Sequence, residues 1–483
     1  MQRRTFLTGT LLGAAFAAAP VTALTTTGAH AATVTVSSIA DLQREIDRAA
    51  PGDRIVLANG TYTVPTNGIR ISGKNATGNH ITIVSQNRGG AVLQGERGFV
   101  LSNSHGITIS GFAFRQNQTL VIPADCSDIR LTRNDIQHAD VAGRDWVVVK
   151  ADNVKIDRSF FHDRTTEGCF LVADGPDAPV DPDRKTMVKG LHIFRNHFAR
   201  HSYGGTSGGE AIRLGASHRA LDNAGAIVEY NLFEECNGDN EAVSVKSCGN
   251  FIRYNTLRTC KGGIVLRHGN GSLVHGNHLI GGVEGIRLYG NDHKVFNNHL
   301  TGLTKRALVI GSGSARDHLP GDSEQEQQAN DAVDRALITH NTLVNNWRCV
   351  AGENHPERPH EPRNVVLSNN ILVGGSGGLV EMGHNTGFTW QGNLLWGSAT
   401  NGNIPAGGFV RTDPRLQQGT DGVFRLASNS PAIGAAVATS HAVTDDLDGH
   451  LRGSSRDIGS DQYSTAVPVR SPLTATDVGP NAA

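Results

Sequence analysis

A short phrase recurs along the chain: an apolar residue, two variable residues, an asparagine, one variable residue and a second apolar residue. Its copies carry Asn134, Asn196, Asn231, Asn255, Asn277, Asn298, Asn341, Asn370 and Asn393. From Asn231 the steps are 24, 22 and 21 residues, followed by one of 43 that predicts about two further turns. A period near 22 residues, with short β-branched segments between Asn- and Gly-bearing turns, indicates the coils of a right-handed parallel β-helix.

The repeated asparagine has a physical role in such a solenoid, where each coil contributes two or three short strands and inward apolar side chains stack into one core. We expect it to occupy one turn position, to tolerate the left-handed backbone conformation there, and to hydrogen-bond to its copies in neighbouring coils. A leucine-rich repeat also spaces Leu and Asn periodically, but the phrase Leu-x-x-Leu-x-Leu is absent and β-branched residues are frequent. The sequence therefore favours an all-β solenoid.

The two ends of the repeat region predict the remaining organisation. Ser38 begins a short amphipathic helix that Pro51 and Gly52 end, and an open β-helix needs such a helical cap at its first coil. We expect the β-helix catalytic domain to span residues 32–410, followed by terminal strands and a cap over 411–465. The last segment, 466–483, is rich in Pro, Ser, Thr and Ala, and we expect it to be disordered.

The first 31 residues have the pattern of an export signal. Arg3 to Leu7 is a twin-arginine sequence, Leu11 to Ala19 is a short apolar stretch, and Ala29 to Ala31 is a small-x-small cleavage sequence. We therefore expect residues 1–31 to be a signal peptide and the mature protein to act outside the cytoplasm, secreted or periplasmic. The apolar stretch is too short to span a bilayer, so we expect no membrane anchor.

Charge and cysteine content narrow the possible partners. The net charge is −1 and charged residues make up 18% of the chain, which gives no basic field for nucleic acid. An acidic polysaccharide must then be attracted by a local cluster of Lys and Arg. Six cysteines are too few for a disulfide scaffold. Cys236 and Cys260 each follow a repeat asparagine by five residues, so their Cα atoms should lie about 4.8 Å apart, either bridged or as reduced thiols.

The densest polar stretch lies between Ser207 and His268 and spans about three coils. Arg267 follows Lys246 by 21 residues, about one coil, which would place the two side chains one rung of the solenoid apart. Arg213 precedes them on the preceding coil. Together these side chains form a predicted positive strip on one outer face of the solenoid.

Two acids accompany this strip. Asp239 and Glu241 are two residues apart, and alternate residues of a strand share a face, so both carboxylates are expected to project together. The set suits β-elimination on a uronic acid, which removes the proton at C5 and expels the oxygen at C4. That reaction needs a cation at the carboxylate, a base and an acid. A calcium ion or an Arg meets the first need, and a Lys whose pKa is lowered by neighbouring cations meets the second.

At these residues the chain resembles polysaccharide lyase family 6, the family of chondroitinase B and many alginate lyases. The resemblance covers most of the mature chain through its coil layout, and it is sharpest where Asp239 and Glu241 precede Lys246 and where Arg267 opens the phrase Arg-His-Gly. It implies that Lys246 abstracts the C5 proton and that Arg267 protonates or stabilises the leaving oxygen. It also implies that Asp239 and Glu241 hold Ca²⁺ against the substrate carboxylate.

Two positions depart from the family pattern. Ser207 stands where an Asn metal ligand usually lies, three residues before Glu210, and Asp239 stands where Glu is common. Serine is a weaker calcium ligand than an amide oxygen, so the ion either binds loosely, recruits Glu210 or is dispensable. The further candidates for substrate binding are Arg213, His268 and Arg287.

The resemblance implies alginate as the substrate, with dermatan sulfate as the alternative. Each site residue also has a structural interpretation: Asp239 and Glu241 in a solvated turn, Lys246 in solvent, and Arg267 paired with an acid of the next coil. A β-helical glycoside hydrolase would instead need two or three carboxylates at the separation that hydrolysis demands. A carbohydrate-binding or adhesin protein would tolerate the change Lys246→Ala without loss of function.

Overall fold

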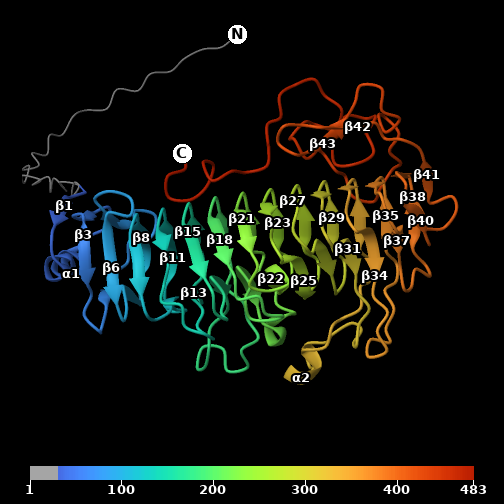
Figure 1. Ribbon diagram of the computed structural model, residues 1–483. Coiled ribbons are helices and arrows are strands. Elements are labelled where there is room, and N and C mark those ends of the chain that lie inside the picture. The colour runs from blue at the N-terminus through green and yellow to red at the C-terminus, as the bar shows by residue number, and fades with distance from the viewer. Residues whose placement is uncertain (1–30) are drawn as a thin grey trace, which may run out of the picture.

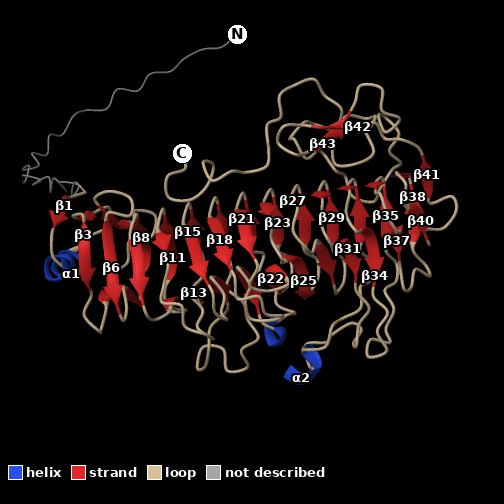
Figure 2. Ribbon diagram, in the orientation of Figure 1, coloured by secondary structure: helices blue, strands red, loops and turns tan. Residues whose placement is uncertain are grey.

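The computed structural model describes residues 31–483 and is a right-handed parallel β-helix, which confirms the predicted fold class (Figure 1). The predicted signal peptide lies outside the described residues, apart from Ala31. Strands dominate and helices are few (Figure 2). Each coil passes through three parallel sheets in turn, which we name sheets 1, 2 and 3. No helix in the described part is long and apolar enough to cross a membrane.

Sheets 1 and 2 each contain fourteen strands. Sheet 1 consists of β1 (Thr33–Val36), β2 (Arg54–Leu57), β5 (Ile81–Ser85), β8 (His105–Ser110), β11 (Ser127–Thr132), β14 (Lys155–Asp157), β17 (His192–Phe194), β20 (Ile227–Glu229), β23 (Phe251–Arg253), β26 (Leu273–His275), β29 (Lys294–Phe296), β32 (Leu337–Thr339), β35 (Val366–Ser368) and β38 (Thr389–Gln391). Sheet 2 consists of β3 (Gly60–Thr63), β6 (Ala91–Gly95), β9 (Ala113–Gln116), β12 (Asp135–Ile136), β15 (Phe160–Arg164), β18 (His197–His201), β21 (Leu232–Cys236), β24 (Thr256–Arg258), β27 (His278–Ile280), β30 (His299–Thr301), β33 (Thr342–Val344), β36 (Ile371–Val373), β39 (Asn393–Trp396) and β41 (Phe409–Arg411).

Sheet 3 has eleven strands and carries the candidate site. It consists of β10 (Leu120–Ile122), β13 (Val147–Val149), β16 (Leu171–Ala173), β19 (Ile212–Gly215), β22 (Glu241–Lys246), β25 (Gly263–His268), β28 (Ile286–Leu288), β31 (Arg306–Ile310), β34 (Arg348–Gly352), β37 (Gly378–Glu381) and β40 (Thr400–Gly402). Two small sheets pair β4 (Ile69–Ser72) with β7 (Phe99–Ser102) and β42 (Leu416–Gln418) with β43 (Phe424–Leu426). The 3₁₀ helix η1 spans Ser217–Arg219.

The predicted helical cap is α1 (Ile39–Arg48). Ser38 is its N-cap, and its hydroxyl accepts a hydrogen bond from the Asp41 backbone N–H at 3.1 Å. The helix buries Leu42 and Ile46 against the apolar interior of the first coils. It therefore covers core side chains that the first coil would otherwise leave in water.

From Asn196 to Asn393 the repeated asparagines form a continuous ladder inside the corner between sheets 1 and 2, whereas Asn134 is separated from it by Ser159 in the coil between. The Asn255 side-chain N–H₂ donates to Asn277 Oδ1 at 3.0 Å and to the Val228 carbonyl of the coil before it at 2.9 Å. The same amide-to-amide bond, also 3.0 Å, joins every neighbouring pair from Asn196 to Asn393. The predicted hydrogen bonding between copies is therefore confirmed.

Two details of the repeat differ from expectation. The left-handed residue of the turn is the one before the asparagine, for example Tyr254 at φ 56°, because only that placement turns the asparagine side chain inward beneath the corner. The step of 43 residues is a single coil, since Asn298 bonds directly to Asn341 and β29 pairs with β32. The extra length lies in an excursion from sheet 3 that carries α2 (Glu324–Gln327), visible below the solenoid in Figure 1.

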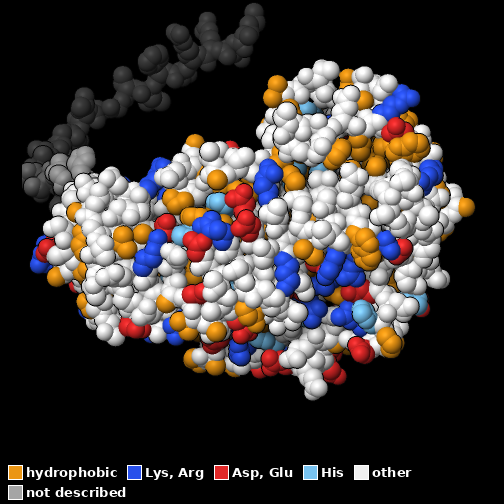
Figure 3. All heavy atoms as spheres, viewed as in Figure 1, with side chains coloured by type: hydrophobic (Ala, Val, Ile, Leu, Met, Phe, Trp, Pro, Cys, Tyr) orange, Lys and Arg blue, Asp and Glu red, His pale blue; other side chains and the backbone are white. Residues whose placement is uncertain are grey.

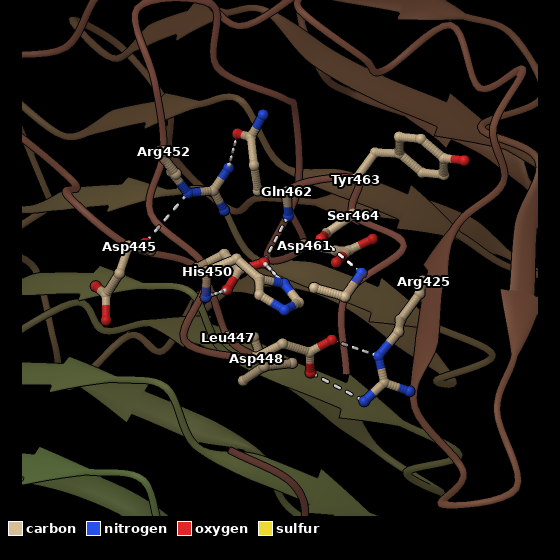
Figure 4. A network of polar contacts seen from close by, with 12 residues as sticks. Arg425, Asp445, Leu447, Asp448, His450, Arg452, Asp461, Gln462, Tyr463 and Ser464 are labelled. Carbon is tan, nitrogen blue, oxygen red and sulfur yellow. Dashed lines mark hydrogen bonds and ion pairs between the residues drawn. The ribbon is translucent and has the colours of Figure 1, made fainter. Parts of the chain in front are cut away.

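Residues 411–465, which we expected to be terminal strands and a cap, contain β42 and β43 and lie over sheet 2 near the last coils (Figure 1). The interior of this cap is a network of carboxylates and guanidinium groups, in which Arg425 Nη2 lies 2.9 Å from Asp448 Oδ1 and Arg452 Nη1 lies 3.4 Å from Gln462 Oε1 (Figure 4). Asp461 Oδ2 accepts a hydrogen bond from the Leu426 backbone N–H at 2.7 Å. These polar bonds, together with a small apolar cluster that includes Leu426, Ala432 and Ile458, hold the cap together.

The expectation that residues 466–483 are disordered is wrong. This C-terminal segment runs back along the solenoid over sheet 2 (Figure 1), where the Leu473 N–H donates to Thr256 Oγ1 at 2.8 Å. Leu473 and Val478 pack on Leu232, and the Gly479 N–H donates to the Arg195 carbonyl at 2.9 Å. The composition of the segment did not indicate that Leu473 and Val478 are buried, because these two apolar residues are widely spaced among Pro, Ser, Thr and Ala.

The six cysteines are all unbridged thiols. Cys236 and Cys260 lie in adjacent coils as predicted, and of the two arrangements that the sequence left open the structure has the reduced pair. Each Sγ points to a backbone carbonyl, at 3.5 Å from Phe198 O and 3.4 Å from Phe233 O respectively. Burial raises the pKa of the Cys236 thiol well above its usual value, so this thiol is inert.

Candidate functional site

The predicted site lies on the outer face of sheet 3, where β19, β22, β25 and β28 are consecutive neighbours. One outward row runs from Arg213 through Ser244 and Val265 to Arg287, each residue opposite the next. The apolar residues that flank this row point into the core, as strand alternation requires. Lys and Arg side chains gather on the surface over β25, β31 and β34 (Figure 3).

Two irregularities in strand pairing decide which side chains reach this face. Lys246 pairs with His268 while Val245 pairs with Leu266, so Arg267 is an extra residue in β25. A second register shift makes Ala242 extra in β22. Such bulges bend a strand locally and redirect its side chains. The prediction that Lys246 and Arg267 lie on adjacent coils is thus met, with Arg267 at the bulge itself.

Lys246 ends β22 and its side chain is about one fifth exposed, at 21%. Its Nζ lies 3.6 Å from Glu210 Oε1 of the preceding coil, and that carboxylate also accepts from the Cys169 thiol at 3.3 Å. Burial alone would raise the pKa of Glu210, but Lys246 and Arg213 outweigh it and hold the pKa below its usual value. Glu210 is therefore ionised beside Lys246.

Asp239 and Glu241 lie beside Glu210 but have different partners. Glu241 accepts from Arg287 Nη2 at 2.9 Å and from Ser244 Oγ at 2.6 Å. Asp239 is only 2% exposed and forms no ion pair with any described residue. Burial raises the pKa of Asp239 to about 6, and the nearby carboxylates of Glu210 and Glu241 add to the rise. Three acids thus converge, and one of them lacks a cationic partner.

Arg267 forms no ion pair with the residues that the structure describes, so its guanidinium is available to a ligand. Its Cζ lies 5.9 Å from the ring centre of Tyr289. Arg287 and Arg358 approach the same ring at 5.9 and 5.4 Å. Three guanidinium groups therefore surround one tyrosine, and their attraction to its ring face partly offsets their mutual repulsion.

Tyr289 itself is fully buried at the end of β28. Its hydroxyl lies 2.9 Å from both carboxylate oxygens of Glu353 and accepts a hydrogen bond from Arg358 Nη1 at 2.8 Å. Sequence reasoning missed Tyr289, Glu353 and Arg358, because the latter two follow β34, two coils beyond β28 in sheet 3. The position of Tyr289 directly after Arg287-Leu288 was the one local signal that pointed to it.

The remaining predicted residues are His268, Arg213 and Ser207. His268 is buried, and its Nε2 lies 3.2 Å from Ser217 Oγ. Burial, with Arg267 and Lys246 beside it, lowers the pKa of His268 well below its usual value and keeps the ring neutral. Arg213 lies in the outward row and its Nη2 is 3.3 Å from Asp145 Oδ2. Ser207, in contrast, is exposed in a loop and makes no hydrogen bond with a described residue.

A metal ion would have to use this carboxylate group. Among residues 31–483, no group of three or more His, Cys, Asp or Glu side chains is arranged to hold an ion. Glu210 and Glu241 are engaged by Lys246 and Arg287, whereas buried Asp239 lacks a compensating cation. Asp239 is therefore the one acid of the three without a cation beside it, and Glu210 and Glu241 would have to turn away from Lys246 and Arg287 to bind an ion with it.

Comparison with known proteins gives a family and a fold. The family model of chondroitinase B matches residues 36–366. A mutant of the PL6 family alginate lyase AlyGC is similar in structure, with a TM-score of 0.72 and 24% identity over 93% of this chain and 58% of that one. A mannuronic acid specific polysaccharide family 6 lyase from human gut microbiota gives 0.68 and 24%, over 79% of this chain and 91% of that one.

A third structure, a PL6 family polysaccharide lyase from Pseudopedobacter saltans, gives a TM-score of 0.63 at 19% identity, over 93% of this chain and 99% of that one. The chain spans only 58% of the length of AlyGC. Among curated protein sequences, no significant match is found. At these identities the structural likeness shows a shared fold.

Proposed function

Because the chain belongs to the chondroitinase B family, we propose that it is a polysaccharide lyase that cleaves a uronate-containing acidic polysaccharide by β-elimination. The observation that carries the proposal is the pairing at the bulge in sheet 3. There Lys246, and Arg267 with no acidic partner, occupy adjacent strands of one outer face. A base and a proton donor one coil apart can address C5 and O4 of the same linkage.

The roles follow from the contacts of each residue. In its neutral form, Lys246 accepts the C5 proton, and the Glu210 carboxylate beside it holds the amine in place. Arg267 stabilises or protonates the C4 oxygen as the C4–O bond breaks and the C4–C5 double bond forms. Arg213 and Arg287 lie in the outward row on either side and bind substrate carboxylates. His268 stays neutral beneath them and positions the bulge.

We propose Ca²⁺ as a cofactor bound by Asp239, with Glu210 and Glu241 as further ligands and Ser207 at the loop above. Bound there, the ion would neutralise the substrate carboxylate and so favour loss of the C5 proton. The uncompensated burial of Asp239 supports this assignment. Calcium titration followed by the thermal unfolding midpoint tests binding without an activity assay: the expected rise is lost in Asp239→Asn, and no rise in the parent would contradict the proposal.

Alginate is the proposed substrate. Two of the similar structures are named as an alginate lyase and as a mannuronic acid specific lyase, and both share the fold of this chain. Dermatan sulfate is the second candidate, favoured by the name of the matching family model. We also propose that the enzyme acts after export, as the twin-arginine pattern of residues 1–31 indicates. The export route is tested by locating the mature protein. It should be found in the periplasm or medium, and the variant Arg3→Lys/Arg4→Lys should stay in the cytoplasm.

One assay separates the candidate activities. The mature protein is incubated with alginate, dermatan sulfate or pectate, and the ultraviolet absorbance of the unsaturated product is followed. A lyase forms a conjugated double bond, whereas a hydrolase releases reducing ends without that absorbance. We expect absorbance to rise with alginate and not in Lys246→Ala. Reducing ends without absorbance would indicate hydrolysis and contradict the proposal.

A further inference from the structure

A cavity lies on the side of the solenoid away from sheet 3. It has a volume of about 430 Å³, lies between the corner of sheets 1 and 2 and the C-terminal segment, and is open to solvent on one side. Arg195, Tyr230, Tyr254 and His278 line it from four successive coils, and Arg470 and Asp477 line it from the segment. Figure 1 shows this segment crossing above β18 and β21. The volume is in the range of sites that bind small organic ligands.

The polar groups around this cavity are largely without protein partners. Arg195 forms no ion pair within the described part of the chain; its Nη1 reaches only the Asp477 carbonyl, at 3.4 Å. The hydroxyls of Tyr230 and Tyr254 make no hydrogen bond with a described residue, although their ring centres lie 5.1 Å apart with the planes tilted by 33°. His278 is 3% exposed and its Nδ1 has no partner. Buried polar atoms are normally satisfied, so the unpartnered His278 Nδ1, beside the half-buried and unpaired Arg195, points to an absent ligand.

The polar groups that line the cavity indicate the chemical class of the ligand. Arg195 is a forked cation without an acid, which suits a carboxylate. Two phenol hydroxyls and a neutral imidazole suit the hydroxyls of a sugar; burial and the neighbouring His299 keep the His278 pKa well below its usual value. Arg470 supplies no second free charge, because Asp445 pairs with it and its guanidinium lies 4.4 Å from the Tyr254 ring centre. A single carboxylate on a polyhydroxylated ring matches this set.

We propose that this cavity is a second saccharide site, which binds one uronate unit of the acidic polysaccharide away from the catalytic face. The identity of the ligand rests on the proposed function. Tyr230 and Tyr254 lie at the corner of sheets 1 and 2, whereas Lys246 ends a strand of sheet 3, so the site anchors the polymer without taking part in the reaction. Anchoring raises the local concentration of further polymer segments at the catalytic face.

The test uses an alginate trisaccharide and the full chain. In the inactive Lys246→Ala background, isothermal titration calorimetry is expected to give two binding events per chain, and Lys246→Ala/Arg195→Gln is expected to give one. Glutamine keeps a donor for the Asp477 carbonyl and removes the charge. The matched control is Arg133→Gln: Arg133 has a positive φ, precedes the repeat asparagine Asn134 and donates to a carbonyl of the segment, but lies outside the cavity. It should retain both events.

Other outcomes decide against the inference. A single binding event in Lys246→Ala would overturn it, and so would two binding events in Lys246→Ala/Arg195→Gln. Full displacement of the second binding event by equimolar inorganic sulfate would also overturn it. In the otherwise native enzyme, Arg195→Gln should raise KM for polymeric alginate about tenfold at unchanged kcat, and an unchanged KM would exclude anchoring. Absence of unsaturated product from any uronan would refute the proposed function alone, because the stoichiometry is measured without turnover.

Discussion

Lys246 Nζ, at the end of β22, lies 3.6 Å from Glu210 Oε1, two residues before the neighbouring strand β19. A surface lysine usually points freely into water, yet this one is mostly buried beside a carboxylate that is itself held by a thiol. The contact fixes the amine where Arg267 of the next strand can face the same ligand. Most of the proposed chemistry depends on this arrangement.

The change Lys246→Ala is expected to abolish the base without disturbing the fold. General-base catalysis contributes roughly 10²–10⁴-fold to rate, so kcat for unsaturated product should fall at least a hundredfold. The assay follows the ultraviolet absorbance of the unsaturated product continuously on each candidate polymer, and the unfolding midpoint is measured alongside. Lys294→Ala on sheet 1 is the control and should keep full activity. Equal activity of the two variants would rule out Lys246 as the base.

Tyr289→Phe removes one hydroxyl from the cluster that supports Arg267 and Arg287. The Glu353 carboxylate and Arg358 lose a shared partner, and a lost hydrogen bond to charged groups costs about 1.5–3 kcal/mol. We expect a lower unfolding free energy and a lower kcat, with KM changed less, because Tyr289 touches no substrate. Tyr62→Phe in β3, whose hydroxyl bonds only the Ala58 carbonyl, is the control. Unchanged kcat would show that the cluster is structural only.

Asn255→Ala interrupts the ladder at its centre. It leaves the Asn231 amide, Asn277 Oδ1 and the Val228 carbonyl each short of a partner in a dry corner, at a cost of about 2–4 kcal/mol. Chemical denaturation should show the loss. Asn401→Ala in β40, at a half-buried position outside the ladder, removes only a bond from Arg411 and should cost about 1 kcal/mol or less. Similar losses for both would mean that the ladder adds little to stability.

Asp461→Asn tests the polar cap in Figure 4. Burial raises the pKa of Asp461 to about 7, with Asp448 and Asp446 adding to the rise. Between about pH 4 and pH 7 the folded protein keeps a proton that the unfolded chain has released, so stability falls as pH rises through this window. The variant should be more stable than the parent by about 4 kcal/mol at pH 8 and equal to it near pH 4. Asp183→Asn, in an exposed loop, is the control substitution.

Deletion of residues 466–483 tests the packing of the C-terminal segment. It exposes Leu232 and leaves the Thr256 hydroxyl without its bond to Leu473, so the unfolding midpoint should fall by several degrees. Hydrogen exchange of β21 and β24 should quicken at the same time, because the segment covers them. An unchanged midpoint with unchanged exchange would show that the segment is disordered, as its composition predicts.

The periodic pattern made the solenoid predictable because each coil repeats the same local solution: a strand, a left-handed turn residue and an asparagine that bonds to its copies. Even so, the residue before the asparagine, such as Tyr254, carries the strained conformation, and only the turn geometry reveals this. The excursion between Asn298 and Asn341 was mistaken for an added coil for a similar reason, since length alone does not distinguish an insertion from a repeat.

For the candidate site, the sequence alone identified residues one coil apart, because a fixed rise per coil turns sequence spacing into position on a face. It therefore predicted that Lys246, Arg267, Asp239 and Glu241 lie close together. Only the tertiary structure decided that bulges at Ala242 and Arg267 redirect those side chains, and that Glu353 and Arg358 reach Tyr289. It also placed the C-terminal segment against Tyr230 and Tyr254. These contacts join residues far apart in the chain, and no local period encodes them.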